Sequence, residues 1–289
     1  TRKYYDLTDE RSAHINKLKG DLHTVFPQYL DVFCDVTGKT STMILRQYGT
    51  PDKILRGHKK TMIEKISKAS RKGLAKASER YEKLCAAANA AKTFGCQIDS
   101  IYFNIFLTLD LVEKLDSALD SILNRIRQLI TFNKNEKFIQ QIKLLNTIPG
   151  VGFLTAVTIM CEIGDFSAFR NPKQLFAYFG LDPEVNESGK FVGTQLHMSK
   201  RGSRIARRAI FAVALASIRT KRNGEGINPY LRKYYELKSG QKPKMVAIGA
   251  VMHKVCNIVF AVLRDEKAFE LRSPEEHCKQ YQRPALAAA

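Results

Sequence analysis

The chain has 289 residues, 44% of them hydrophobic, which is enough to bury a core and corresponds to about two domains. Its formal net charge of +19 favours a polyanionic partner, above all nucleic acid, because cationic side chains bind such polymers with release of counterions. No apolar run approaches the roughly 18 to 20 residues that cross a bilayer, and the first residues lack the apolar core of a signal peptide. We therefore expect no membrane partner and a cytoplasmic location.

The six cysteines are scattered along the chain, with neither the CxxC spacing nor the histidine pairs of a zinc site. This pattern predicts reduced, mostly buried thiols and no structural metal. The cysteines are Cys34, Cys85, Cys96, Cys161, Cys256 and Cys278.

The first part of the chain is predicted to be helical and basic. Apolar residues recur at steps of three and four over residues 6–26, Pro27 ends that helix, and short helical pieces follow over residues 40–56. Residues 53–80 carry ten lysines and arginines against only Glu64 and Glu79. This run is either a solvated helix face or a surface that contacts phosphate backbones.

The most regular pattern is a heptad-like apolar stripe inside a long helix predicted over residues 94–132. The helix either docks in a bundle within the chain or joins chains into a dimer or tetramer. Its length of about 50 Å favours the homo-oligomer. The stripe consists of Ile98, Ile101, Ile105, Thr108, Val112, Leu115, Leu119, Ile122, Ile126 and Leu129.

After Lys134 the pattern changes to short helices and loops. We therefore predict a basic helical linker and coiled-coil region over residues 1–134, a helical domain over 135–270, and a poorly ordered tail over 271–289. The predicted fold class is all-α, with a long coiled-coil or bundle helix followed by a helical domain that contains a helix–hairpin–helix.

A tight turn between two helices is predicted at the segment Ile-Pro-Gly-Val-Gly, residues 148–152. Pro149 ends one helix, Gly150 and Gly152 allow unusual backbone dihedrals, and a second helix begins near Thr155. Free backbone N–H groups at that helix start suit a phosphate oxygen, as in the helix–hairpin–helix of DNA-binding proteins. The alternative is an ordinary helical turn in which the glycines serve packing.

Residues 191–223 contain no Asp or Glu, although the chain has 28 acidic residues, and this gap again favours a polyanion. Inside it, Ser199 or Ser203 caps the apolar helix that follows. The functional alternative is that Ser199 is a nucleophile, with nearby arginines stabilising the charge on an attacked phosphate. The residues predicted to contact DNA or RNA are Gly150, Gly152, Thr155, Lys173, Lys200, Arg201, Arg204, Arg207 and Arg208.

Several motifs follow one another in a fixed order and together resemble one family. They are Ile-Pro-Gly-Val-Gly at 148–152, Glu-Ile-Gly-Asp at 162–165, Phe-Arg-Asn-Pro-Lys-Gln-Leu-Phe-Ala-Tyr-Phe-Gly-Leu at 169–181, Ser-Gly at 188–189, Ser-Lys-Arg-Gly at 199–202 and Lys-Pro-Lys at 242–244. In this order they resemble the C-terminal domain of the insertion-sequence transposases related to the Piv invertase, the bridge-RNA-guided serine recombinases. The resemblance covers residues 142–269, and the part before it resembles the linker and coiled coil of these proteins.

The resemblance implies that Ser199, with Gly202 as the glycine of a Ser-x-x-Gly motif, attacks a DNA phosphate and forms a covalent phosphoserine link. It implies double-stranded DNA and a guide RNA as partners, in a bacterial or archaeal nucleoid. It further implies Mg²⁺ held mainly by four acidic residues of an N-terminal RuvC-like domain. We expect that domain to lie outside this chain, so the chain alone is expected to be inactive and no metal ligand is assigned in it.

Two other hypotheses compete with a recombinase. One is a non-catalytic helix–hairpin–helix module that binds DNA or RNA, and the other is a structural oligomeriser whose charge is incidental. His197 is set aside as a general base for Ser199, because we expect neighbours two apart to point to different sides of the backbone.

Overall fold

The computed structural model describes residues 1–96, 98–184, 187–188, 191–192, 197–273 and 275–276. Apart from one short antiparallel strand pair, every regular element in these residues is helical, which confirms the predicted all-α class. The elements are α1 (Arg2–Val25), α2 (Tyr29–Val32), α3 (Lys39–Gln47), α4 (Pro51–Arg56), α5 (Lys59–Ser70), α6 (Leu74–Phe94), α7 (Asp99–Thr131), α8 (Glu136–Asn146), α9 (Phe153–Ile163), the 3₁₀ turn η1 (Phe166–Ala168), α10 (Pro172–Tyr178), β1 (Glu187–Ser188), β2 (Phe191–Val192), α11 (Arg204–Ser217), α12 (Pro229–Ser239) and α13 (Lys244–Asp265).

The chain divides into two compact units. We call Lys3–Arg125 the N-terminal unit, and Thr1–Arg2 together with Ile126–Ala289 the C-terminal unit. The predicted domain limits at residues 134 and 270 remain predictions.

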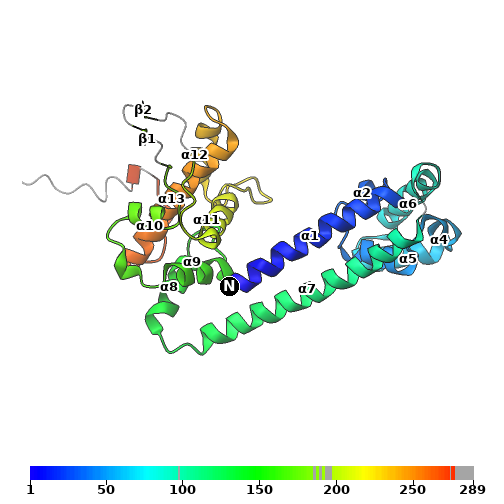
Figure 1. Cartoon of the computed structure of the whole chain (residues 1–289), viewed down its shortest axis with the longest axis horizontal. Coiled ribbons are helices and arrows are strands. Elements are labelled where there is room, and N and C mark those ends of the chain that lie inside the picture. Colours follow the sequence, from blue (N-terminus) through cyan, green and yellow to red (C-terminus); the bar gives the residue numbers. More distant parts are fainter. Residues whose placement is uncertain (97, 185–186, 189–190, 193–196, 274, 277–289) are drawn as a thin grey trace, which may run out of the picture. The chain divides into compact units, whose positions relative to one another are not determined.

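In the N-terminal unit, α1 and α7 lie side by side and run antiparallel (Figure 1). Arg11 of α1 forms an ion pair with Asp116 of α7. Further along, the hydroxyl of Tyr102 donates a hydrogen bond to the carbonyl oxygen of Val25 at 3.5 Å. Residue numbers therefore rise along α1 as they fall along α7, which is the arrangement of an antiparallel helical hairpin.

The apolar stripe that runs along α7 is buried along its middle and exposed at both ends. Ile105, Val112 and Leu119 are buried within the chain. By contrast, Ile98 at the start of the stripe is 44% exposed, and Leu129 at its end is 54% exposed. The middle of the stripe therefore serves packing inside one chain, as the bundle alternative expects. The joining of two or more chains through this helix stays a prediction.

Helices α2 to α6 gather at one end of the α1–α7 pair (Figure 1). The core that they share with α1 includes fully buried Leu22, Tyr29, Ile54 and Leu84. The Tyr29 hydroxyl is hydrogen-bonded to the carbonyl oxygen of Ser41 at 3.0 Å, which satisfies its polar atom in an apolar setting. Burial raises the pKa of this phenol well above its ordinary value.

The C-terminal unit is built around α13, against which α8, α10, α11 and α12 pack. Helix α11 also packs against α9. Its buried face is rich in small residues, among them Ala206, Ala209 and Ala214, which let neighbouring helices approach closely. This packing fixes both ends of α11, and the two ends carry the features described below.

Helix α13 corrects the expectation that no segment of the chain is long and apolar enough to cross a bilayer. Its length of 22 residues, with a mean hydropathy of 2.0 in its most apolar 18-residue window, suffices by composition to cross a membrane, although charged and polar residues interrupt its apolar runs. However, 56% of its most apolar window is buried inside the unit. Val251, Val255 and Val259 on its inner face are completely buried, as in the core helix of a globular unit.

The expectation of mostly buried thiols is wrong for the five cysteines that the structure describes, since only Cys256 is classed as buried. Cys278, and the predicted disorder of residues 277–289, lie outside the described residues.

Candidate active site

The predicted nucleophile Ser199 lies in a loop that folds back on the chain segment following α10. The Ser199 N–H donates to the Asp182 carbonyl oxygen at 2.8 Å, and the Lys200 N–H donates to the Gly180 carbonyl oxygen at 3.1 Å. On the other side, the Glu184 N–H donates to the His197 carbonyl oxygen at 2.7 Å. These backbone bonds fix the position of Ser199 before any side chain is considered.

Two glycines allow the loop to approach this segment closely. A Cβ atom at Gly202 would overlap the Tyr178 carbonyl oxygen and lie 2.6 Å from the Gly180 nitrogen. Gly180 itself has a φ of +65°, a left-handed conformation that disfavours other residues. The motif therefore needs a glycine at position 202, because the loop passes too close to the backbone of residues 178–180 for a side chain. This glycine helps to position the serine three residues before it.

The Ser199 hydroxyl donates a hydrogen bond of 2.7 Å to the Asp182 carboxylate oxygen Oδ1. A carboxylate at this distance can accept the proton of a serine that attacks an electrophile. Asp182 was not singled out from the sequence, where it lies 17 positions before Ser199. It is the first residue after the motif at 169–181, and this adjacency is the signal that could have identified it.

His197 was set aside as a base for a reason that the structure corrects. Met198 forms an antiparallel bridge with Pro183, so the backbone around it is extended. In extended backbone, residues two apart share a face, so His197 and Ser199 are on the same side. The hydroxyl of Ser199 nevertheless donates to Asp182, which makes that carboxylate the better candidate.

Helix α11 is capped by Ser203 and not by Ser199. The Ser203 hydroxyl accepts the Ala206 N–H at 3.1 Å and donates to Glu162 Oε2 at 2.7 Å. Ser199 takes no part in this cap. The alternative that one of the two serines only caps the helix therefore applies to Ser203 alone.

Glu162 supports this cap from α9, with a side chain that is only 3% exposed. Arg2, which belongs to the C-terminal unit, donates to both of its carboxylate oxygens, from Nε at 2.9 Å and from Nη2 at 3.0 Å. The hydrogen bond from Arg2, followed by that from Ser203, lowers the pKa of Glu162 despite its burial. A charged carboxylate is therefore kept beneath the start of α11.

The predicted arginines have different surroundings. Arg207 uses Nη1 to bind the carbonyl oxygens of Gly202, at 2.8 Å, and Phe179, at 3.2 Å, so it ties the loop to α10. Lys200 and Arg201 are exposed in the loop, and Arg204 is exposed in the first turn of α11. Lys173 is exposed in the first turn of α10, whereas Arg208 is half-buried.

The predicted hairpin turn joins α8 to α9. Gly150 has a φ of +97°, and a Cβ there would lie 2.8 Å from the Ser217 hydroxyl oxygen. That hydroxyl donates to the Pro149 carbonyl oxygen at 2.9 Å, which ties the turn to the end of α11. Gly152 caps α9, is exposed and has open space around it, and Thr155 is half-buried in the first turn.

The turn and the Ser199 loop therefore lie at opposite ends of α11. Ser217 is the last residue of this 14-residue helix, and Ser203 caps its start. At 1.5 Å per residue the two ends are about 21 Å apart. The predicted site residues thus form two clusters held on one rigid helix.

The implied Mg²⁺ would need several oxygen ligands close to Ser199. Ser199 has one carboxylate, that of Asp182, within hydrogen-bond distance. Among the described residues there is no group of three or more His, Cys, Asp or Glu side chains that could hold a metal ion. These residues alone do not fit a magnesium centre.

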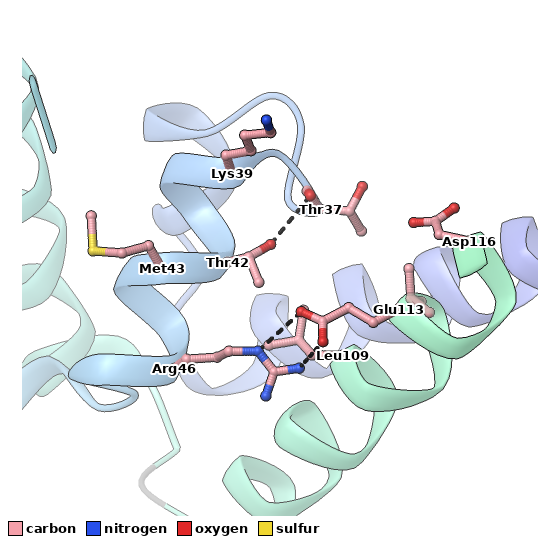
Figure 2. Close-up of a pocket in the computed structure, with 9 residues that line it drawn as sticks. Thr37, Lys39, Thr42, Met43, Arg46, Leu109, Glu113 and Asp116 are labelled. Atoms are coloured by element: carbon pink, nitrogen blue, oxygen red, sulfur yellow. Dashed lines mark hydrogen bonds and ion pairs between the residues drawn. The ribbon is translucent and has the colours of Figure 1, made fainter. Parts of the chain in front are cut away.

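A pocket of about 340 Å³ in the N-terminal unit, between α3 and α7, is lined by a mixture of charged, polar and apolar side chains (Figure 2). Arg46 reaches Asp110 at 2.7 Å and Glu113 at 2.9 Å, and Asp116 pairs with Arg11. These carboxylates thus form ion pairs with arginines of the same unit, so the pocket is a poor match for a cationic ligand.

Comparison with known proteins finds a similarity to a transposase family over the segment that carries this geometry. Residues 142–236 match the model of the transposase IS116/IS110/IS902 family. The matched segment includes the hairpin turn, Asp182, the Ser199 loop and all of α11.

The relatives are bacterial. Over 272 residues, or 93% of the chain, identity is 24% to an insertion element IS110 uncharacterized 43.6 kDa protein of Streptomyces coelicolor, 63% of which is covered. Over 177 residues, or 61% of the chain, identity is 30% to a pilin gene-inverting protein of Moraxella bovis, 52% of which is covered. A transposase for insertion sequence element IS1111A of Coxiella burnetii is 26% identical over 188 residues, 63% of the chain and 50% of that protein. The chain thus spans about half to two thirds of the length of these curated relatives.

Proposed function

We propose that the protein is a DNA recombinase or transposase that cuts and rejoins DNA through a covalent phosphoserine intermediate at Ser199. The observation that carries the proposal is the 2.7 Å hydrogen bond from the Ser199 hydroxyl to Asp182, inside a segment that matches a transposase family. A serine needs such a base partner to attack at neutral pH. The exposed cations Lys200, Arg201 and Arg204 around it suit a phosphate.

In the proposed step, the Ser199 oxygen bonds to phosphorus and one phosphorus–deoxyribose oxygen bond breaks. The serine proton passes to Asp182, and the leaving oxygen takes a proton from solvent. Cations beside the loop stabilise the extra negative charge on the phosphate. Rejoining is the reverse step, in which a deoxyribose hydroxyl attacks the phosphoserine and releases Ser199.

The finer parts of the proposal rest on the family resemblance. They are a guide RNA as a second nucleic-acid partner, and Mg²⁺ supplied with acidic ligands from outside the described residues. The helix–hairpin–helix at α8–α9 is proposed as a clamp on the phosphate backbone, about 21 Å from Ser199 across α11.

The proposal is tested by trapping the protein–DNA adduct in the natural full-length context of the chain. A nicked DNA substrate whose cut end can diffuse away should accumulate the adduct, and peptide mass spectrometry should place the phosphodiester on Ser199. Ser199→Ala should abolish the adduct and leave DNA affinity within about twofold, because only the nucleophile is removed.

Ser203→Ala is the matched control, since it removes a serine hydroxyl four residues away. It should retain the adduct and lower the stability of the unit by about 1 kcal/mol through loss of the helix cap. An adduct in Ser199→Ala, or one mapped to another residue, would contradict the assignment and favour a non-catalytic binding module.

A further inference from the structure

The turn between α5 and α6 in the N-terminal unit is a concentrated basic surface. Residues 65–78 contain five lysines or arginines and no Asp or Glu. All five are exposed, and Lys65 is hydrogen-bonded to Gln47 at 2.9 Å. The other four are Lys68, Arg71, Lys72 and Lys76. We call these four residues the α5–α6 tip.

Two cations near the tip form ion pairs with carboxylates of the same unit, whereas those of the tip do not. Lys59 pairs with Glu82 at 2.9 Å, and Lys83 pairs with Glu79 at 2.7 Å. Among the described residues, no carboxylate lies within ion-pair distance, 4.0 Å, of a tip side chain. The tip thus holds its charge in water, where it is available to an outside polyanion.

The apolar faces of α5 and α6 are buried in the core of the unit. Met62 and Ile66 of α5 and Ala77 of α6 are at most 1% exposed, and Leu74 is the exposed large apolar side chain of the turn. A helix that lies on a membrane keeps its whole apolar face for the lipid. The tip therefore suits a highly charged polymer better than a lipid surface.

Residues 65–78 also contain no aromatic side chain. Proteins that hold single-stranded nucleic acid stack its bases on aromatic rings, whereas a duplex presents its phosphates outward and needs only cations. Flexible lysines bind phosphates as point charges without selecting a base sequence. We propose that the α5–α6 tip is a second nucleic-acid contact, which binds the phosphate backbone of a duplex independently of base sequence.

The tip has no cutting role of its own, although its sequence resembles the Ser199 loop. Ser70-Arg71-Lys72-Gly73 matches Ser199-Lys200-Arg201-Gly202, and Arg71 and Lys200 both have a φ of 54°. However, the Ser70 hydroxyl donates to the Ser67 carbonyl oxygen at 3.4 Å and accepts the Lys72 N–H at 3.3 Å. With no carboxylate partner comparable to Asp182, this turn can hold a backbone but lacks an activated nucleophile.

The test compares two variants with the same change in charge, both made in the Ser199→Ala chain so that no covalent capture contributes. The tip variant replaces Lys68, Arg71, Lys72 and Lys76 by Gln. The control variant replaces four other exposed lysines of the same unit by Gln, namely Lys17, Lys19, Lys83 and Lys114. Dissociation constants are measured across salt concentrations for a 30-base-pair DNA duplex, an RNA duplex of the same sequence, and phosphatidylserine vesicles.

In about 0.15 M salt we expect the tip variant to bind a duplex about 30-fold more weakly or worse, because losing two phosphate contacts reduces the log–log salt slope by about 1.8. The control should change by less than about threefold. A loss on either duplex supports the proposal, and the larger loss identifies DNA or RNA as the partner. Equal weakening in both variants, or a loss confined to vesicles, would overturn it.

A measurement on the unsubstituted chain guards against misfolding of the tip variant. Lysine acetylation is followed by mass spectrometry with and without the duplex. Lys68, Lys72 and Lys76 should be protected by the duplex, whereas Lys17 and Lys19 should react at their unbound rates. Full reactivity of the tip lysines in the complex would refute the contact even if the substituted chain unfolds.

Discussion

At the scale of single residues, the loop around Ser199 joins a hydroxyl to a carboxylate through backbone geometry. Asp182 reaches Ser199 because the loop is bonded to Gly180 and Asp182 through main-chain atoms. The side chains then meet at 2.7 Å without needing a helix or strand to present them.

Asp182→Asn tests whether that carboxylate takes the proton. An amide keeps the size of the side chain and an oxygen that accepts a hydrogen bond, but it is not a base. We expect the rate of adduct formation to fall about 10²- to 10⁴-fold, the usual contribution of a positioned general base, with DNA affinity unchanged. The control is Glu184→Gln, at an exposed position two residues after Asp182, and it should form the adduct at the parent's rate. An equal loss in both variants would point to local charge as the cause.

Glu162 gives the unit a specific dependence on pH. Its pKa in the folded state is lowered, chiefly by the hydrogen bond from Arg2. Its stabilisation is therefore present above the unfolded value of about 4.3 and is lost as the pH falls through the lower folded value. Glu162→Gln should lower the free energy of unfolding at pH 7 by about 1 to 3 kcal/mol and flatten its decline below about pH 5. Urea unfolding at pH 7 and pH 4 measures both, and parallel pH curves for the two proteins would refute this role.

At the scale of elements, the two glycines of the hairpin turn differ in what surrounds them. Gly150 is held against Ser217, whereas a Cβ at Gly152 would meet nothing within 4 Å. Gly152 has an ordinary φ of −92°. The fold thus explains Gly150 but leaves Gly152 without a packing reason.

Gly152→Ala therefore tests the proposed phosphate clamp. The free energy of unfolding of this variant should stay within about 0.5 kcal/mol of that of the parent, because the methyl group has room and the backbone is unstrained. If a phosphate approaches the start of α9, the methyl group blocks it, and the affinity for duplex DNA should fall about tenfold. Gly150→Ala, the contrasting variant, should lose stability through overlap with Ser217. Unchanged DNA affinity in a folded Gly152→Ala protein would exclude phosphate binding at the start of α9 and leave the hairpin with a packing role only.

The sequence predicted these elements better than it predicted their contacts. Periodic apolar spacing and glycine–proline turns are local properties, so α1, α7 and the α8–α9 turn could be anticipated. The partner of Ser199 could not, because a contact between residues 17 positions apart depends on how the loop folds back. Similarly, nothing local distinguishes Arg207, which binds two carbonyl oxygens, from an arginine that faces solvent. Hydropathy alone could not assign α13, because the helices packed around it determine its environment.

At the scale of the whole molecule, the predicted homo-oligomer needs a surface that the fold leaves open. The middle of the α7 stripe is buried, but Phe103 and Leu107, four residues apart on one face, are 67% and 48% exposed. Phe103→Ser with Leu107→Ser should shift the sedimentation coefficient toward that of a monomer of 32.7 kDa. Leu237→Ser, at a 61% exposed position in α12, should leave it unchanged. Sedimentation unaffected by the paired change would exclude this face of α7 as the interface.

Helix α11 separates the two clusters of the segment that matches the transposase family model. Its 14 residues separate the Ser199 loop from the hairpin turn by about 21 Å, and B-form DNA rises about 3.4 Å for each base pair. A clamp and a nucleophile so spaced would engage phosphates about six base pairs apart along the duplex. A helix neither stretches nor compresses readily, so the distance between the clamped phosphate and the cleaved phosphate would be fixed by the length of α11. Lengthening α11 would therefore move the cleavage position relative to the clamped position.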